Sequence, residues 1–502
     1  GDGSYGEGFS YLAHAMHDIN PALNAMDQTF GVRFPEKINR AYKFLLYQGN
    51  SSKKTLLDFG DSTDRLGRMS SFTYMISKYR DPYLKWLYDL TPGRSDEDLL
   101  LMDDSVPAKS PDDLPTVKLF SDVGTAIFRS GFGGDDFVFV FRCGPFYNHQ
   151  HFDQGGFILA DRGEKFLYEM GKSSYYNDPW YQKLIIQPGG HNCILVDGNP
   201  ESQLQGDLLH DVPAWNNHAA ITDFMRFDDG GFASGRLDPL YKGKLGTLRR
   251  SVLYIEPRMA VIIDEAADPN DAREINLRFQ APYRDEISVD GNNAVIAHNG
   301  KNLSIRTLSP SGYSADIMKR PMTTTEFSGA DAVTMKARGF LQLSAGLGSE
   351  PTVFVNVLST DQKALSQISE RIFDDHICLS VRNLYCINTT GGQDFTEKEL
   401  TTDALVYATL SNDPRANGYR AMRTTKVVVA GETILRSDKP VSVVSRYSSF
   451  QYTAAEDVKI AVKLNAKPAM VSLDGEKITG WRYNNGMLSM SLSAGSGVLI
   501  FE

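Results

Sequence analysis

Cysteine and long apolar runs are both scarce in this sequence, and each shortage excludes a class of protein. The 502 residues include only four cysteines, far fewer than a small scaffold built on disulfides contains. No apolar stretch approaches the roughly 18 residues that a membrane-spanning helix needs. We therefore expect neither a disulfide-rich module nor a membrane span.

Positive charge is also in short supply. Lys and Arg total 52 against 62 Asp and Glu, so the net charge is −10, and no basic run is longer than Lys53-Lys54 or Arg249-Arg250. A general nucleic-acid binder depends on massed cations, and the sequence argues against that class. A polyanionic substrate stays open, because a cleft can be locally basic on an acidic protein.

The cysteines leave two alternatives open. Cys378 and Cys386 flank a plausible turn at Arg382-Asn383, so they could form a hairpin disulfide in an oxidising compartment or remain buried thiols. Cys193 lies two residues after His191 and, on a strand, would share its face. A buried thiol is the commoner role for such a cysteine, with metal ligation as the alternative.

The chain divides into a helical part and a longer β part. Apolar residues at helical spacing predict helices over 8–19, from Pro35 onward, over 83–90 and over 96–102, with a loop at 58–62. After the Pro-, Asp- and Ser-rich stretch 107–115, short runs typical of strands continue to the end. The strands expected first are 125–129, 137–142, 157–160, 194–196, 251–255 and 260–264. Helices followed by strands predict separate domains, the second built of stacked antiparallel sheets.

The most informative cluster is His149, His151 and Asp153, within five consecutive positions. Alternate residues of an extended strand share one face, so these three side chains are expected to project together. A structural role, a metal site completed by Glu169 and His191, and a catalytic base all fit such a cluster. The cluster alone does not separate them.

Four sequence blocks together resemble the heparinase II/III-type polysaccharide lyases. Residues 2–11 (DGSYGEGFSY) resemble that family's DGSxxEGxxY segment, and 149–157 (HQHFDQGGF) its HxHxDxGxF strand. Residues 169–171 (EMG) stand where the family has an acidic residue followed closely by Gly, and 191–198 (HNCILVDG) resemble its HNxxxVDG strand. The four blocks occur in the family's order and spacing, and the resemblance covers the whole chain.

The resemblance implies an α+β multidomain fold and a reaction. The fold is a partial (α/α) toroid, here residues 1–106, followed by large stacked antiparallel β-sheets over 107–400 and a C-terminal β region over 401–502. The reaction is β-elimination at a uronic acid: a base removes the C5 proton, the carboxylate is neutralised, and the C4 oxygen leaves with help from an acid. A heparin- or heparan-sulfate-like glycosaminoglycan is the preferred substrate, with alginate as the alternative.

The resemblance also assigns residues. Tyr11 matches the catalytic tyrosine that protonates the leaving group, and His149 matches the catalytic histidine. From their position near the cluster, and not from the resemblance, Asn148 and Arg142 are candidates for contact with an acidic sugar, with an ordinary structural role as the alternative for both. Tyr176, in an aromatic stretch between Glu169 and His191, is a candidate for stacking on sugar rings.

A zinc ion, viewed as structural, is the implied cofactor. His151, Glu169 and His191 match the family's zinc-binding positions, although Asp is commoner than Glu at the second of them. Asp153 is then expected to orient a histidine from outside the ligand set.

Part of the toroid is expected to lie outside this sequence. The chain starts at Gly1 with neither Met nor signal peptide, too late to hold the residue that neutralises the uronate carboxylate in the family. We expect a longer N-terminal helical region in the complete protein and, from the family likeness, a periplasmic or secreted location.

Two other functions compete with the lyase: a glycoside hydrolase using paired carboxylates such as Glu7 and Asp61, and a carbohydrate-binding protein without catalysis.

Overall fold

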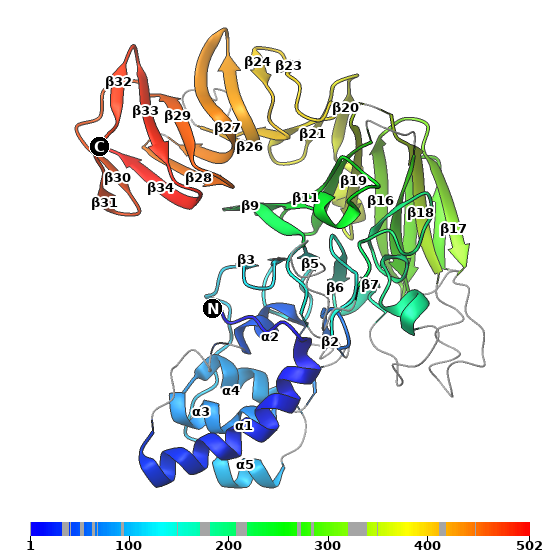
Figure 1. The fold of residues 1–502 in the computed structure, drawn as a ribbon, viewed down its shortest axis with the longest axis vertical. Coiled ribbons are helices and arrows are strands. Elements are labelled where there is room, and N and C mark those ends of the chain that lie inside the picture. The colour runs from blue at the N-terminus through cyan, green and yellow to red at the C-terminus, as the bar shows by residue number, and fades with distance from the viewer. Residues whose placement is uncertain are drawn as a thin grey trace.

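The computed structural model shows a helical layer at one end of the molecule and a succession of β-sheets that curves away from it (Figure 1). It describes residues 2–32, 40, 42–50, 55–62, 66–67, 69–91, 95–147, 149–170, 181–206, 218–268, 273–282, 286–319, 339–348, 350–410, 418–446 and 448–502. Among these residues, no helix is both long and apolar enough to cross a membrane.

The helical layer is built around one long helix. Its helices are α1 (Gly8–Phe30), α2 (Tyr42–Gln48), α3 (Thr73–Tyr79), α4 (Pro82–Asp89) and α5 (Asp96–Leu101), joined by the 3-10 turn η2 (Ser70–Phe72) and the strand pair β1 (Gly49–Asn50) and β2 (Thr55–Leu56). Helix α1 buries Phe9, Leu12, Met16 and Leu23 along one stripe, the spacing that the sequence predicts. It ends at Gly31, whose φ of 63° suits a residue without Cβ.

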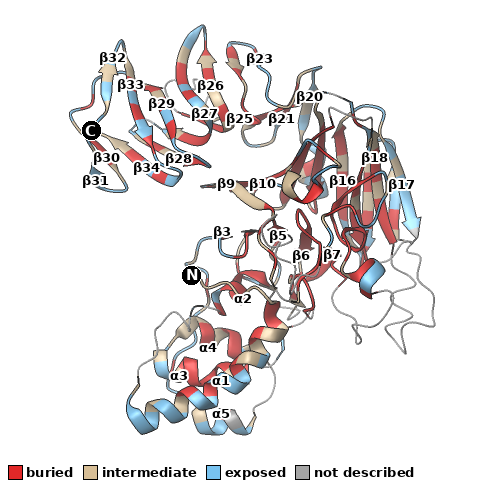
Figure 2. Cartoon of the chain, viewed as in Figure 1, coloured by how far each residue is buried: buried red, intermediate tan, exposed pale blue. Residues whose placement is uncertain are grey.

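The first sheet is buried on both faces. It contains β3 (Val117–Phe120), β4 (Thr125–Arg129), β5 (Val138–Arg142), β6 (Phe157–Asp161) and β7 (Glu164–Leu167), antiparallel and in sequence order. Ile127, Val140 and Ile158 pack with the helices, whereas Phe128 and Phe139 pack with the next sheets. The sheet therefore joins the helical layer to the β part, and its strands β5, β6 and β7 are coloured as buried in Figure 2.

Two further sheets share a hydrophobic core with the first one. The four-stranded sheet has the order β17 (Ser314–Lys319), β18 (Gly339–Gly346), β13 (Glu274–Ala281), β8 (Ile194–Val196). The eight-stranded sheet has the order β14 (Ile287–Asp290), β15 (Asn293–His298), β16 (Lys301–Ser309), β19 (Thr352–Ser359), β12 (Met259–Ala267), β11 (Thr247–Ile255), β10 (Gly230–Arg236), β9 (Ala220–Phe227). Three short helical turns stand between strands: η3 (Tyr181–Ile185), η4 (Pro188–Gly190) and η5 (Asp238–Tyr241).

The C-terminal region forms the largest sheet, of 15 strands, which curves back over β9 (Figure 1). After the short helix α8 (Gln362–Ser366) its strands are β20 (Ser369–Ile372), β21 (His376–Ser380), β22 (Leu384–Asn388), β23 (Phe395–Glu397), β24 (Leu400–Thr402), β25 (Val406–Thr409), β26 (Tyr419–Val429), β27 (Glu432–Arg446), β28 (Ser449–Ala454), β29 (Val458–Lys463), β30 (Val471–Leu473), β31 (Glu476–Lys477), β32 (Arg482–Asn484), β33 (Met487–Leu492) and β34 (Gly495–Phe501). Cys378 and Cys386 face each other across β21 and β22 and form a disulfide. Of the two alternatives left by the sequence, the structure therefore has the hairpin disulfide.

The predicted elements agree well with the observed ones. The helix predicted over 8–19 continues to Phe30, because Pro21 inside it does not end it. The strands expected at 125–129, 157–160 and 194–196 are β4, β6 and β8, and the mixed fold of helices and stacked sheets is confirmed. The helix predicted from Pro35 lies mostly outside the described residues.

Candidate active site and metal centre

The segment that carries the histidine cluster is a loop, so the predicted strand is wrong. Residues 149–156 form the last part of the connection between β5, which ends at Arg142, and β6, which begins at Phe157. His149 has a φ of 58° and Gly155 a φ of 81°, and both values are incompatible with an extended strand. His149, His151 and Asp153 consequently do not share one face through strand alternation; the loop directs each side chain separately.

His149 meets Tyr11 from the helical layer. Their rings stack at a centroid distance of 3.6 Å and an interplanar angle of 12°. Tyr11 lies in the first turn and a half of α1, whose N-terminus is held because the Phe9 N–H donates to Asp58 Oδ2 at 2.7 Å. The two residues assigned to proton transfer thus lie in contact, one from each part of the fold.

The glycine-rich segment before α1 is attached to the same loop. The side chain of Gln150 accepts from the Tyr147 N–H at 3.0 Å and donates to the Gly6 carbonyl. A Cβ on Gly6 would come within 2.4 Å of the Tyr147 ring, so only glycine allows this approach. The DGSxxEG block therefore serves to bring the start of α1 against the His149 loop.

Asp61 is the residue of this site that the sequence did not connect with the histidines. Its carboxylate is completely buried; Oδ1 lies 3.1 Å from His151 Nε2, and Oδ2 lies 3.4 Å from His149 Nδ1 and accepts from the Tyr181 hydroxyl at 2.8 Å. Burial acts to raise the pKa of Asp61, but the hydrogen bonds and charge of His151, with the bonds from Tyr181 and His149, outweigh it and lower that pKa. Asp61 therefore remains a buried carboxylate.

The loop before Asp61 approaches the histidine loop at backbone distance. The Asp61 N–H donates to the His149 carbonyl at 2.9 Å. Gly60 has a φ of 73°, and a Cβ there would lie 2.5 Å from the same carbonyl oxygen. The two loops can be this close only because residue 60 is glycine.

Gly60→Ala is expected to lower the free energy of unfolding by about 1 to 3 kcal/mol, because it combines a positive φ with a backbone clash. Thermal or denaturant unfolding measures the change. Gly243→Ala is the matched control: its φ is 79°, but a Cβ there meets no described atom within 4 Å, so it carries only the conformational cost of roughly 1 kcal/mol. Equal destabilisation by both variants would contradict the close approach.

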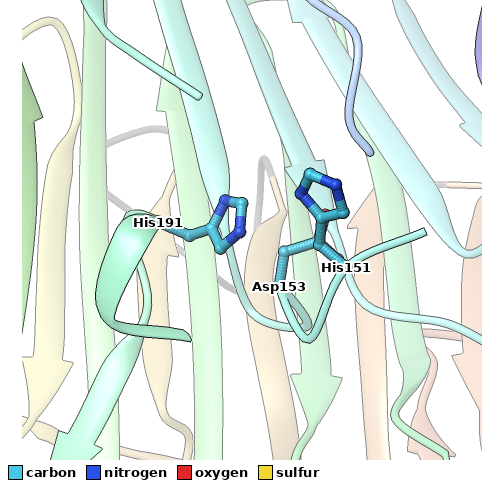
Figure 3. A group of neighbouring side chains, drawn as sticks. All are labelled: His151, Asp153 and His191. Atoms are coloured by element: carbon cyan, nitrogen blue, oxygen red, sulfur yellow. The ribbon is translucent and has the colours of Figure 1, made fainter. Parts of the chain in front are cut away.

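His151, Asp153 and His191 form a second group of side chains (Figure 3). All three are fully buried, and His151 links this group to Asp61. One ligand atom from each lies within 4.8 Å of the other two. Glu169 joins the group because its Oε2 contacts His191 Nδ1. Within the described part of the chain, His151 Nδ1, both Asp153 carboxylate oxygens and Glu169 Oε1 are buried without a hydrogen-bond partner.

The hydrogen bonds of this group fit a bound cation. His191 Nε2 lies 2.8 Å from the Ile185 carbonyl and must donate to it, so in the neutral ring Nδ1 and Glu169 Oε2 are two acceptors facing each other. Such a pair requires a shared proton or a metal ion. Burial raises the pKa of Glu169 against the opposing charge of His191, while Glu169 raises the pKa of His191 against the effect of burial.

Other predicted residues are placed as follows. Arg142 is buried and forms an ion pair with Asp153, at 3.2 Å between Nε and Oδ1, which is the structural alternative to a sugar contact. Cys193 points its thiol at the Gln154 carbonyl, at 3.6 Å, which is the buried-thiol alternative. Asn148 and Tyr176 lie outside the described residues.

Arg250 of β11 fastens two loops of the site to the sheets behind them. Its guanidinium is buried and binds Asp264 of β12 through two hydrogen bonds, of 2.6 and 3.0 Å. Nη1 also donates to the carbonyls of Gly155, at 2.7 Å, and Asn192, at 2.8 Å. One arginine therefore holds the loop after Asp153 and the loop after His191.

Comparison with known proteins gives a family for the β part. Residues 112–370, just over half of the chain, match the model of the heparinase II/III-like C-terminal domain. Among curated protein sequences none gives a significant match.

Solved structures of similar fold come from polysaccharide lyases. The heparan sulfate lyase HepC from Pedobacter heparinus has a TM-score of 0.59 and 17% identity over 79% of this chain and 60% of its own. A heparinase III has a TM-score of 0.59 and 15% identity over 78% of this chain and 60% of its own. A xanthan lyase from Paenibacillus has a TM-score of 0.53 and 13% identity over 100% of this chain and 50% of its own. The chain spans about three fifths of the length of the first of these proteins, and at these identities the likeness concerns the fold.

Proposed function

This chain belongs to the heparinase II/III-like family, and from that premise we propose that it acts as a polysaccharide lyase, cleaving a uronate-containing acidic polysaccharide by β-elimination. The observation that carries the proposal is the stacked contact between Tyr11 and His149. The helical layer supplies one residue and the β part supplies the other. A C5 proton and a C4 oxygen on one sugar ring need two proton-transfer groups that lie close together.

Each residue has one role in the proposed reaction. Tyr11 donates its hydroxyl proton to the departing C4 oxygen, and it can also serve as the base for one uronate epimer. His149, through the ring nitrogen that carries no proton, accepts the proton from C5. No nucleophile is required, because the electrons of the broken C5–H bond form the C4–C5 double bond while the C4–O bond breaks. The product is a 4,5-unsaturated uronate.

Heparin- or heparan-sulfate-like glycosaminoglycan is the preferred substrate in this proposal. The support is the family and the fold shared with a heparan sulfate lyase and a heparinase III. Alginate is the alternative outcome of the test. A glycoside hydrolase that uses Glu7 and Asp61 is disfavoured, because Asp61 is completely buried and engaged by two histidines and a tyrosine.

The test offers heparan sulfate, hyaluronan, chondroitin and alginate to the complete protein and follows the ultraviolet absorbance of unsaturated uronate. We expect absorbance to rise with new reducing ends, fastest on heparan sulfate. If unsaturated uronate forms fastest from alginate, alginate replaces heparan sulfate as the proposed substrate, and the proposed β-elimination stands. New reducing ends without absorbance would establish hydrolysis and overturn the proposal.

We further propose that one zinc ion is bound by His151, Glu169 and His191, the three residues that the resemblance implies, and by Asp153. Asp153 is thereby proposed as a ligand and not, as expected from the sequence, as a residue that orients a histidine from outside the ligand set, because its carboxylate lies with His151 and His191 in the buried group. Two imidazoles with carboxylates are a donor set that zinc accepts, and four buried donor atoms of the group have no hydrogen-bond partner among the described residues. The ion would supply positive charge that ties the His149 loop to β7 and β8. All proton transfer is left to Tyr11 and His149.

Elemental analysis of the purified protein is expected to find about one zinc per chain, as for other closed protein sites. His191→Gln is expected to remove it, because it takes away a buried donor next to Glu169. His218→Gln is the control, since His218 is only half-buried and its Nδ1 faces the Ala219 carbonyl. A folded wild-type protein without zinc, or full zinc in His191→Gln, would contradict the site.

Two further properties are proposed for the complete protein. The helical layer exposes Phe30, Leu99 and Leu100, with 75%, 73% and 83% of their surface accessible, so we propose that additional helices of a larger toroid cover them and provide the group that neutralises the uronate carboxylate. A periplasmic or secreted location is supported by the Cys378–Cys386 disulfide, which persists in oxidising compartments.

A further inference from the structure

We infer that Asp61 is a positioning residue that fixes the proton arrangement of His149 and His151 at the same time. The inference rests on the function proposed above for its link to catalysis, whereas the arrangement itself can be measured without activity. One carboxylate reaches two histidines that serve different purposes in the proposed enzyme: His149 beside Tyr11, and His151 in the metal centre.

The geometry gives each oxygen of Asp61 its own histidine. Oδ1 lies 3.1 Å from His151 Nε2, and Oδ2 lies 3.4 Å from His149 Nδ1. Three groups that can donate, the two histidines and the Tyr181 hydroxyl, meet the two oxygens of Asp61, an arrangement that suits a carboxylate, which can only accept hydrogen bonds. Both ring nitrogens that face it must therefore carry a proton, so His149 is held as the Nδ1–H form and His151 as the Nε2–H form.

These two tautomers are the ones that the proposed roles need. With the proton on Nε2, His151 turns an unprotonated Nδ1 toward the metal centre, and Nδ1 is its buried atom without a partner among the described residues. With the proton on Nδ1, His149 has its basic lone pair on Nε2, away from Asp61. A carboxylate behind a histidine commonly fixes its tautomer in this manner.

Hydrogen bonds from the protein fix Asp61 in the position from which it faces both histidines. Its backbone N–H binds the His149 carbonyl, and the Tyr181 hydroxyl donates to Oδ2 at 2.8 Å. The carboxylate has no exposed surface, so water does not compete for its oxygens. The Asp61 carboxylate is consequently a fixed group that contacts both the metal centre, through His151, and the proton-transfer pair, through His149.

The first test is nitrogen NMR of the metal-free protein labelled with ¹⁵N-histidine, with His149→Gln and His151→Gln used to assign the signals. Wild type is expected to show His149 protonated at Nδ1 and His151 at Nε2. Asp61→Asn is expected to change the tautomer of one of them, because an amide offers one acceptor and one donor where the carboxylate offered two acceptors. Tyr181→Phe, which removes only the third hydrogen bond, is expected to keep both tautomers.

The second test measures function in the zinc-loaded protein. Asp61→Asn is expected to lower kcat by about 10- to 100-fold, with KM nearly unchanged, and to weaken zinc binding by a factor in the same range, as loss of a supporting partner does. Asp61→Glu keeps two acceptor oxygens and is expected to recover part of the lost kcat and part of the lost zinc affinity. A change in KM alone would overturn the assignment.

The two tests also separate this inference from the proposed function. Wild-type His149 protonated at Nε2, or unchanged tautomers in Asp61→Asn, would overturn the inference even if the protein is an active lyase. An inactive wild type with the expected tautomers would instead refute the lyase reaction and leave the role of Asp61 intact. The assigned wild-type spectrum keeps the inference testable if Asp61→Asn does not fold.

Discussion

Tyr11→Phe is expected to lower kcat/KM on the preferred uronate polymer by about 10²- to 10⁴-fold, the contribution usual for a positioned general acid. The variant keeps the ring that stacks on His149 at 3.6 Å and removes the hydroxyl group that would donate the proton. Zinc content and the free energy of unfolding should therefore remain close to those of wild type. Release of unsaturated uronate at several substrate concentrations measures the effect and assigns it to kcat or KM.

Tyr83→Phe is the matched control for this experiment. It lies in α4 of the same helical layer, and its hydroxyl binds Asp113 on the exposed surface, so its removal should leave the rate unchanged. The double variant Tyr11→Phe/His149→Gln should have a kcat/KM only slightly below that of the slower single variant, because the effects of residues that act as a unit are not additive. Wild-type rates in Tyr11→Phe would eliminate it as the acid.

Arg250→Ala is expected to produce the largest loss of stability, about 3 to 5 kcal/mol, because it leaves the buried Asp264 carboxylate without its counter-charge. It also removes the donor to the Gly155 and Asn192 carbonyls. The loops that carry Asp153 and His191 should then loosen, and zinc should be lost with activity. Denaturant unfolding and zinc analysis measure the two effects.

Two variants separate the ion pair from the loop contacts. Arg250→Met combined with Asp264→Leu removes both buried charges, so stability should recover in part, whereas zinc affinity should not, since the two loop carbonyls still lack their donor. Arg236→Ala is the surface control, because its side chain is 52% exposed and lies 3.9 Å from Asp238; it should change stability by less than about 0.5 kcal/mol. Full zinc affinity in the double variant would contradict the role assigned to Arg250.

The sequence predicted the elements whose signals are local. The stripe of Phe9, Leu12 and Met16 identified α1, and the β-rich runs identified β4, β6 and β8. The contact between Tyr11 and His149 followed from the family resemblance, since nothing local connects a helix residue with a loop residue far along the chain.

The errors and omissions arose where tertiary contacts decide. Alternation predicts a strand at 149–153, but His149 has a positive φ and its carbonyl accepts from the Asp61 N–H, a tertiary contact that no local pattern reports. Asp61 was seen only as half of a carboxylate pair, although the loop 58–62 was expected. The Gly-Asp dipeptide in that loop was the available signal: a glycine for close approach, followed by a carboxylate.

The sheet of β3–β7 has a consequence for how the molecule holds together. Because one face packs with the helices and the other with the β part, neither neighbour can detach without exposing the apolar surface of the sheet to water. A boundary near residue 106 divides the chain by secondary structure, while the packed core runs across it. The helical layer and the first sheet should accordingly unfold in one cooperative step. Tyr11 and His149 should therefore lose their native positions together.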